Sequence, residues 1–143
     1  MVDADVIAAK LAELADRIHR IREHRPEDAE ILAEDRDAFE LVSFNLMLAV
    51  QVCTDVASHL IADEGWPPAG DLAEAFRRLH EQGVLSRPTA EALARATGLR
   101  NVVAHVDARA DPELVFRAAT SGPDDLERFS REVAGWVQRG SVP

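Results

Sequence analysis

The sequence predicts an all-α fold, an up-and-down bundle of five to six helices. Apolar residues recur at steps of three and four along most of the chain, as they do on one face of a helix. No stretch shows the strict apolar–polar alternation of a half-buried strand. Turn signals built from Gly, Pro and Asp separate the periodic stretches into pieces of helical length.

The composition fits one globular domain over residues 1–143, with 47% apolar and 29% charged residues. The net charge of −10 disfavours non-specific binding to nucleic acid, which depends on neutralising phosphates, and suits a basic partner surface. One cysteine, Cys53, provides neither a disulfide framework nor a cysteine-based metal cluster. Neither a signal peptide nor a membrane span is evident, so we expect a cytoplasmic protein that makes no membrane contact.

The first half of the chain predicts two helices. Residues 3–25 carry one apolar stripe and end at Pro26. Residues 35–64 carry two stripes, and a helix with two apolar faces is buried on both. Either this is the central helix of the bundle, or its second face meets another subunit. That second face contains Leu41, Leu48 and Val52.

The second half predicts shorter helices. A short helix starts at Asp71 and ends near Gly83. The next helix opens at Ser86-Arg87-Pro88, with proline tolerated in the first turn, runs to Gly98, and continues, or resumes, through 99–106. Asp111, followed by a proline and a glutamate, is a helix start. The sequence Ser-Gly-Pro-Asp at 121–124 predicts a break before the last amphipathic helix.

Polar residues interrupt the apolar faces of the 35–64 helix. They either lie at helix edges or line a cleft shared with a functional site, and they are Asn45, Gln51, Thr54, Asp55, Ser58 and His59. Arg77 and Arg78 also allow two interpretations. They form either a solvated face or part of a rim that attracts phosphate.

Chemistry-bearing residues gather in the stretch Gly98–Asp107, where Arg100, Asn101 and His105 interrupt small apolar residues. Arginine presents a planar, permanently charged fork that matches phosphate oxygens. Histidine transfers protons near neutral pH. An Arg and a His at fixed spacing also occur together by chance: Arg17 and His24 fit a looser version of the pattern, on a charge-rich helix end.

Arg100 and His105, separated by four residues, match the motif of the HEPN superfamily. The chain resembles the HepT-like branch of that superfamily. This branch is the toxin half of a bacterial toxin–antitoxin pair whose antitoxin is a nucleotidyltransferase. The resemblance covers most of the chain. Its segments, in order, are the first amphipathic helix, then residues 57–62, 76–79, 83–85 and 98–105.

The resemblance implies a HEPN-like bundle that forms a homodimer and brings two motifs to one intersubunit cleft. It implies metal-independent RNA cleavage in a type VII-like toxin–antitoxin system, with no cofactor and with a cognate nucleotidyltransferase (MNT-domain) antitoxin as partner. His105 would be the general acid or base, and Arg100 would stabilise the phosphate and transition state. Asn101 would hold substrate or orient His105.

Helix geometry restricts how the motif assembles. Residues five apart on an ideal helix lie roughly 140° apart around its axis. Arg100 and His105 therefore converge if the helix is distorted, if Arg100 reaches round the helix, or if a partner subunit completes the site.

Asp107 marks a departure from the family pattern. Members commonly have a tyrosine there, to which the antitoxin attaches AMP, but this sequence contains no tyrosine. The antitoxin would then act by binding alone, or modify a hydroxyl such as that of Ser58 or Thr97. Alternatively, Asp107 is a fixed negative charge that weakens RNA binding. If Asp107 lies close to His105, it favours the protonated imidazole.

These alternatives leave open whether the protein is an enzyme. The competing hypothesis is a catalytically weak or inactive HEPN binding module that dimerises and binds a nucleotidyltransferase-domain protein. A metal enzyme is a poorer match, because His59, His80 and His105 form no helical ligand pair with a carboxylate at a suitable spacing.

Overall fold

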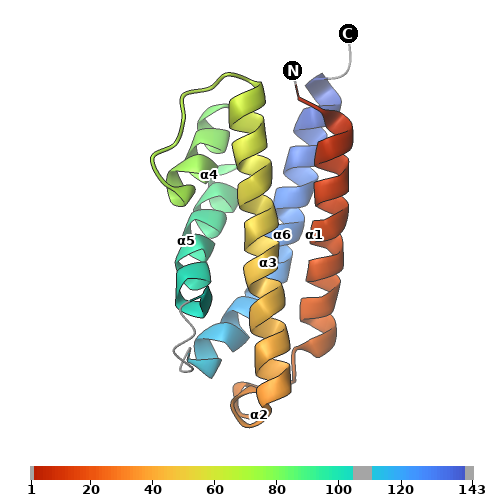
Figure 1. Ribbon diagram of the computed structural model, residues 1–143, viewed down its shortest axis with the longest axis vertical. Coiled ribbons are helices and arrows are strands. Elements are labelled where there is room, and N and C mark those ends of the chain that lie inside the picture. Colours follow the sequence, from red (N-terminus) through yellow and green to blue (C-terminus); the bar gives the residue numbers. More distant parts are fainter. Residues whose placement is uncertain (1, 105–110, 141–143) are drawn as a thin grey trace.

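The computed structural model describes residues 2–104 and 111–140, and side chains at 2–99 and 111–140. Within these residues every regular secondary-structure element is an α-helix (Figure 1). The all-α prediction is thus confirmed. The six described helices are α1 (Ala4–His24), α2 (Ala29–Glu34), α3 (Arg36–Asp63), α4 (Leu72–Glu81), α5 (Arg87–Ala104) and α6 (Pro112–Gly140).

Aspartate side chains cap the beginnings of the first four helices. Each accepts a hydrogen bond from a backbone N–H in the first turn, which has no partner within the helix. The capping residues are Asp3, Asp28, Asp35 and Asp71. At the ends of α3 and α4 the chain turns at Gly65 and Gly83, both with positive φ, which glycine adopts without a Cβ clash.

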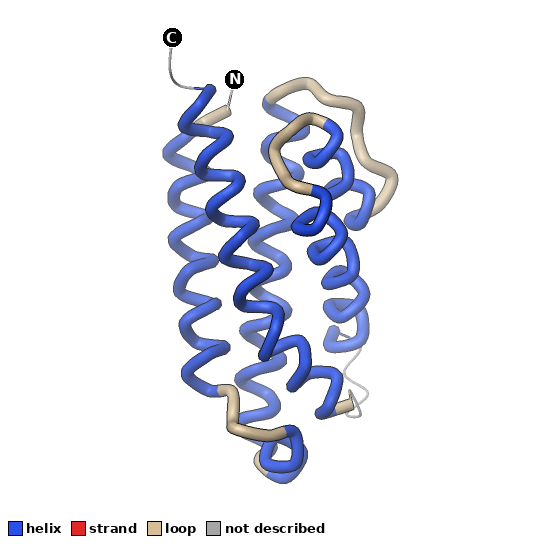
Figure 2. Tube along the Cα trace, turned by 180° about the vertical axis from the view of Figure 1, so that it is seen from behind, coloured by secondary structure: helices blue, strands red, loops and turns tan. Residues whose placement is uncertain are grey.

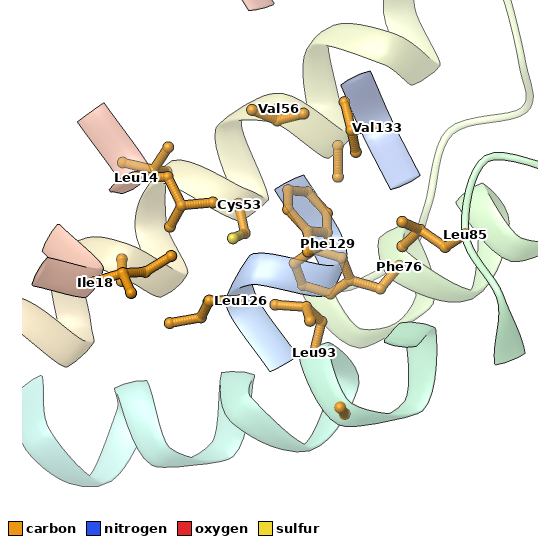
Figure 3. Packing of buried hydrophobic residues seen from close by; sticks show 14 of the residues in the cluster. Leu14, Ile18, Cys53, Val56, Phe76, Leu85, Leu93, Leu126, Phe129 and Val133 are labelled. Carbon is orange, nitrogen blue, oxygen red and sulfur yellow. The ribbon is translucent and has the colours of Figure 1, made fainter. Parts of the chain in front are cut away.

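Helix α3 is the centre of the bundle. It contacts each of the other five helices, as expected for a central helix. The alternative, a second face that meets another subunit, stays a prediction. By length and composition α3 could cross a membrane, but most of it is buried inside the bundle, as in a core helix. At the centre of the core (Figure 3), Cys53 is fully buried, and the rings of Phe76 and Phe129 meet edge to face with centroids 6.0 Å apart.

The apolar face of α3 is not covered along its whole length. Val52 is buried, whereas Leu41 is 40% exposed and Phe44 is 51% exposed. The first turns of α3 therefore present apolar side chains to solvent within the single chain.

The predicted break at 121–124 is wrong, because α6 continues through Pro123. Proline lacks the N–H that would bond the carbonyl of Ala119 and usually kinks a helix. Pro123 and Leu126 are both buried, so tertiary packing overrides the local turn signal. The early part of α6 leans away from the axis of the rest (Figure 2). The short helix α2 was not predicted separately.

Candidate functional site

Helix α5 carries the residues that the sequence singles out, and α6 anchors its beginning. The Glu132 carboxylate accepts a hydrogen bond from the backbone N–H of Ser86 at 2.6 Å and one from the Thr89 hydroxyl at 2.7 Å. The Ser86 hydroxyl lies 3.2 Å from the same carboxylate. A negative charge is favourable at this end of a helix. Glu132 thus fixes the start of α5 against α6.

Arg100 and Asn101 lie in the last turn of α5. The helix runs without interruption across Gly98 to Ala104. Arg100 follows Ala96 by four residues, and Asn101 follows Thr97 by four, so each pair is adjacent on the helix surface. His105 and Asp107 lie outside the described residues. Of the predicted site, the structure places the backbone of Arg100 and Asn101.

A groove lies beside this part of α5. It has a volume of about 480 Å³ and is formed by α3, α5 and α6. Small and apolar residues make up most of its lining, including Ala92, Ala96 and Leu99 of α5. These three share one helix face by their spacing. The lining therefore extends to the residue immediately before Arg100.

Two arginines line the groove, Arg95 from α5 and Arg117 from α6. Both are exposed, and among the described residues neither guanidinium makes a direct hydrogen bond or ion pair, although Arg95 attracts the Glu91 carboxylate one turn earlier on α5 and helps to lower its pKa. The groove also contains Asp125, whose carboxylate accepts a hydrogen bond from Arg128 at 2.8 Å. Sequence analysis missed this site, because it did not place the start of α6 beside α5.

Arg77 and Arg78 form no free cationic rim. Arg77 pairs with Glu91 at 3.1 Å, and this hydrogen bond lowers the pKa of the Glu91 carboxyl. Arg78 donates to the carbonyl of Pro67 at 3.0 Å and pairs with acidic neighbours on α4. Arg77 therefore belongs to a solvated ion pair, whereas Arg78 is largely buried by the contacts that bind it.

The second Arg–His pair is structural. Arg17 donates to the side-chain oxygen of Asn45 at 3.1 Å, which joins α1 to α3. The amide of Asn45 donates in turn to the carbonyl of Leu41 at 2.8 Å. His24 lies 3.5 Å from Glu23. The bond to Asn45 thus uses the Arg17 side chain within the bundle, whereas the His24 contact is with its neighbour in sequence.

Most of the other polar groups that interrupt the apolar faces of α3 also meet partners within the bundle, whereas the buried hydroxyl of Ser43 has none among the described residues. Gln51 donates to Asp55 at 3.0 Å, and Asp55 pairs with Lys10 of α1 at 3.7 Å. Thr54 donates to the carbonyl of Gln51, and His59 lies 3.7 Å from Asp63. These contacts favour the interpretation of helix-edge groups. No three described His, Cys, Asp or Glu side chains are grouped as metal ligands.

The two candidate hydroxyls lie in different places. Ser58 lines a cavity with Trp66 and Leu72. The connector from α3 to α4, which contributes Trp66, lies toward the end of the bundle opposite the last turn of α5 (Figure 1). Thr97 donates to the carbonyl of Ala94 at 2.7 Å, one turn before Asn101. By position on the helix, Thr97 is the hydroxyl next to the candidate site.

Comparison with known families decides the classification. The model of the family described as ribonuclease HepT-like matches residues 14–133, which include Arg100 and His105. The chain belongs to this family. The HepT-like chain is 22% identical over 125 residues to the mRNA nuclease HepT of Shewanella oneidensis, covering 87% of this chain and 93% of the relative.

Solved structures share the HepT-like fold. One is a tri-AMPylated Shewanella oneidensis HEPN toxin in complex with MNT antitoxin, with a TM-score of 0.83, 22% identity, and coverage of 94% of this chain and 99% of that one. Another is YutE of Bacillus subtilis, a cytosolic protein of unknown function, with a TM-score of 0.85, 13% identity, and coverage of 99% and 95%. At these identities the likeness establishes the fold.

Proposed function

We propose that this HepT-like chain is a ribonuclease toxin that cleaves RNA without a metal ion, using Arg100 and His105. The observation that carries the proposal is the family match over residues 14–133, which spans the motif. The relative described as an mRNA nuclease supports RNA as the substrate. The position of Arg100 and Asn101 in the last turn of an anchored helix is compatible with a fixed site.

The proposed reaction is an internal transfer at phosphorus. A base removes the proton from a ribose 2′-hydroxyl, the 2′-oxygen attacks the adjacent phosphorus, and the bond to the 5′-oxygen breaks. An acid returns a proton to the leaving oxygen, which gives a 2′,3′-cyclic phosphate and a 5′-hydroxyl. His105 transfers the protons, a role typically worth ~10²–10⁴-fold in rate. Arg100 stabilises the charge on the phosphate oxygens.

We further propose that residues 1–143 act as one HepT-like domain, in a homodimer and in the cytoplasm. Two copies of His105 at one cleft would provide acid and base separately, and Asn101 would hold the substrate or orient His105. The partner is a nucleotidyltransferase antitoxin, as in the complex of the Shewanella oneidensis toxin. Because the sequence contains no tyrosine, that antitoxin acts on this chain without modifying one.

Expression in cells tests the proposal against the alternative of a binding module. The wild type should arrest growth and deplete mRNA, His105→Ala should do neither, and His24→Ala should behave as the wild type. His24→Ala is the matched control, because it removes a histidine from the second Arg–His pair. Co-expression of a cognate nucleotidyltransferase antitoxin should restore growth. Normal growth with the wild type, present at the same level as the variants, would favour the binding module.

A further inference from the structure

The groove beside the candidate site carries a local positive charge on an acidic protein. The chain has a net charge of −10, yet Arg95 and Arg117 line the groove with no ion-pair partner among the described residues. The one acid in the lining, Asp125, is paired with Arg128. The groove's own charge is therefore positive.

Several other arginines with described side chains form ion pairs that neutralise their charge. Those with ion pairs to Asp or Glu are Arg22, Arg36, Arg77, Arg78 and Arg128. Arg17 is engaged with Asn45, and Arg25 lies over the ring of Phe116, 5.5 Å from its centroid. Other exposed arginines, such as Arg20 and Arg139, also make no direct ion pair among the described residues, but Arg95 and Arg117 come from two helices and line one groove.

The lining between these two cations suits a flat apolar group. An apolar lining flanked by guanidinium groups matches a nucleotide. The flat face of a base packs on apolar side chains, and a phosphate accepts hydrogen bonds from a guanidinium. The volume of about 480 Å³ lies within the ~300–1,000 Å³ typical of ligand sites. An apolar peptide would leave both charges without a partner.

The groove lies beside the part of α5 that leads to Arg100. Ala96 lines it, and Arg100 follows Ala96 by one helical turn. The last turns of α5 and the first turns of α6 lie side by side in both overall views (Figures 1 and 2). A strand lying in the groove would therefore extend from the position of Arg100 along α5.

We propose that this groove binds a segment of single-stranded RNA next to the bond that is cleaved. A base packs against Leu99 and the small residues of the lining, and Arg95 and Arg117 each contact a phosphate. The inference rests on the proposed function, because its ligand is the substrate of that reaction. It adds two substrate-binding residues outside the Arg100–His105 motif.

The test measures binding of a fluorescent single-stranded RNA to the purified full chain over a series of salt concentrations. Relative to the wild type, Arg95→Ala/Arg117→Ala should weaken binding by at least about tenfold at low salt. Each phosphate contact on a single strand contributes about 0.7 to the slope of log affinity against log salt. The slope of the double variant should therefore be shallower by about 1.4.

Two further variants separate local contacts from general charge. Arg20→Ala/Arg139→Ala removes the same charge from exposed arginines outside the groove lining, and should change binding little. Ala118→Leu fills the groove without changing charge, and should weaken binding while leaving the salt slope unchanged. Circular dichroism and thermal melting confirm that each variant is folded.

The outcomes separate this inference from the proposed function. If the wild type cleaves RNA but the groove variants bind it as the wild type does, the groove proposal is overturned and the proposed function stands. If both double variants weaken binding equally, the effect is general charge and the groove proposal is again overturned. A wild type that neither binds nor cleaves RNA contradicts both.

Discussion

Glu132→Gln is expected to destabilise the start of α5, the helix that carries the candidate site. In the wild type the Glu132 carboxylate accepts a hydrogen bond from the backbone N–H of Ser86 and one from the Thr89 hydroxyl, at 2.6 and 2.7 Å. Burial by itself raises the pKa of Glu132, but the hydrogen bonds from Ser86 and Thr89 outweigh burial and lower it. The folded state therefore favours the ionised carboxyl.

The expected loss is about 1–2 kcal/mol in the free energy of unfolding. A hydrogen bond to a charged group contributes about 1.5–3 kcal/mol, and a charge at a helix terminus adds about 0.3–1 kcal/mol. Partial exposure of Glu132 to solvent reduces these values, and glutamine keeps one oxygen that accepts the bond from Ser86. The net effect is therefore smaller than the sum.

Urea denaturation at pH 7 and at lower pH measures this loss. The stabilisation from a carboxyl with a lowered pKa is complete above its unfolded pKa, about 4.3, and disappears as pH falls through the folded pKa. The difference between wild type and Glu132→Gln should therefore shrink as pH falls below about 4. Glu127→Gln, which breaks an exposed pair with Arg22, should cost less than about 1 kcal/mol. Equal stability of wild type and Glu132→Gln at pH 7 would refute the capping role.

Two further predictions concern the core. Phe129→Ala removes a fully buried ring that packs on Phe76, and should lower the free energy of unfolding by about 3–5 kcal/mol in urea. Phe44→Ala, at a 51% exposed side chain, should change it by less than about 0.5 kcal/mol, and equal effects would contradict the assigned burial. Burial raises the pKa of the Cys53 thiol well above its usual value, so Ellman's reagent should label it only after unfolding. Rapid labelling of the native protein would contradict this.

Local signals in the sequence predict most of the fold, because helix periods and caps are encoded by neighbouring residues. The spacing of Leu14 and Ile18 and the capping role of Asp71 follow directly from such signals. Pro123 shows where they fail. Its local preference is to interrupt a helix, but burial against other helices outweighs that preference, and burial depends on residues far away in the sequence.

The candidate site likewise has a part that the sequence predicts and a part that only tertiary packing reveals. Residue type and spacing single out Arg100 and His105, and helix geometry places Arg100 one turn after Ala96. The sequence does not reveal that Arg95 and Arg117 line the same groove, because they belong to different helices that only tertiary packing brings together. Tertiary contacts likewise show that Arg17 is engaged with Asn45, which spacing alone does not reveal.

The central claim is RNA cleavage at His105 without a metal ion. The most direct test incubates single-stranded RNA with purified wild type and with His105→Ala, both in EDTA and both verified as folded. The wild type should cleave the RNA into products that end in a 2′,3′-cyclic phosphate, and His105→Ala should not cleave it. Equal cleavage by both proteins, or cleavage by neither, would contradict this claim.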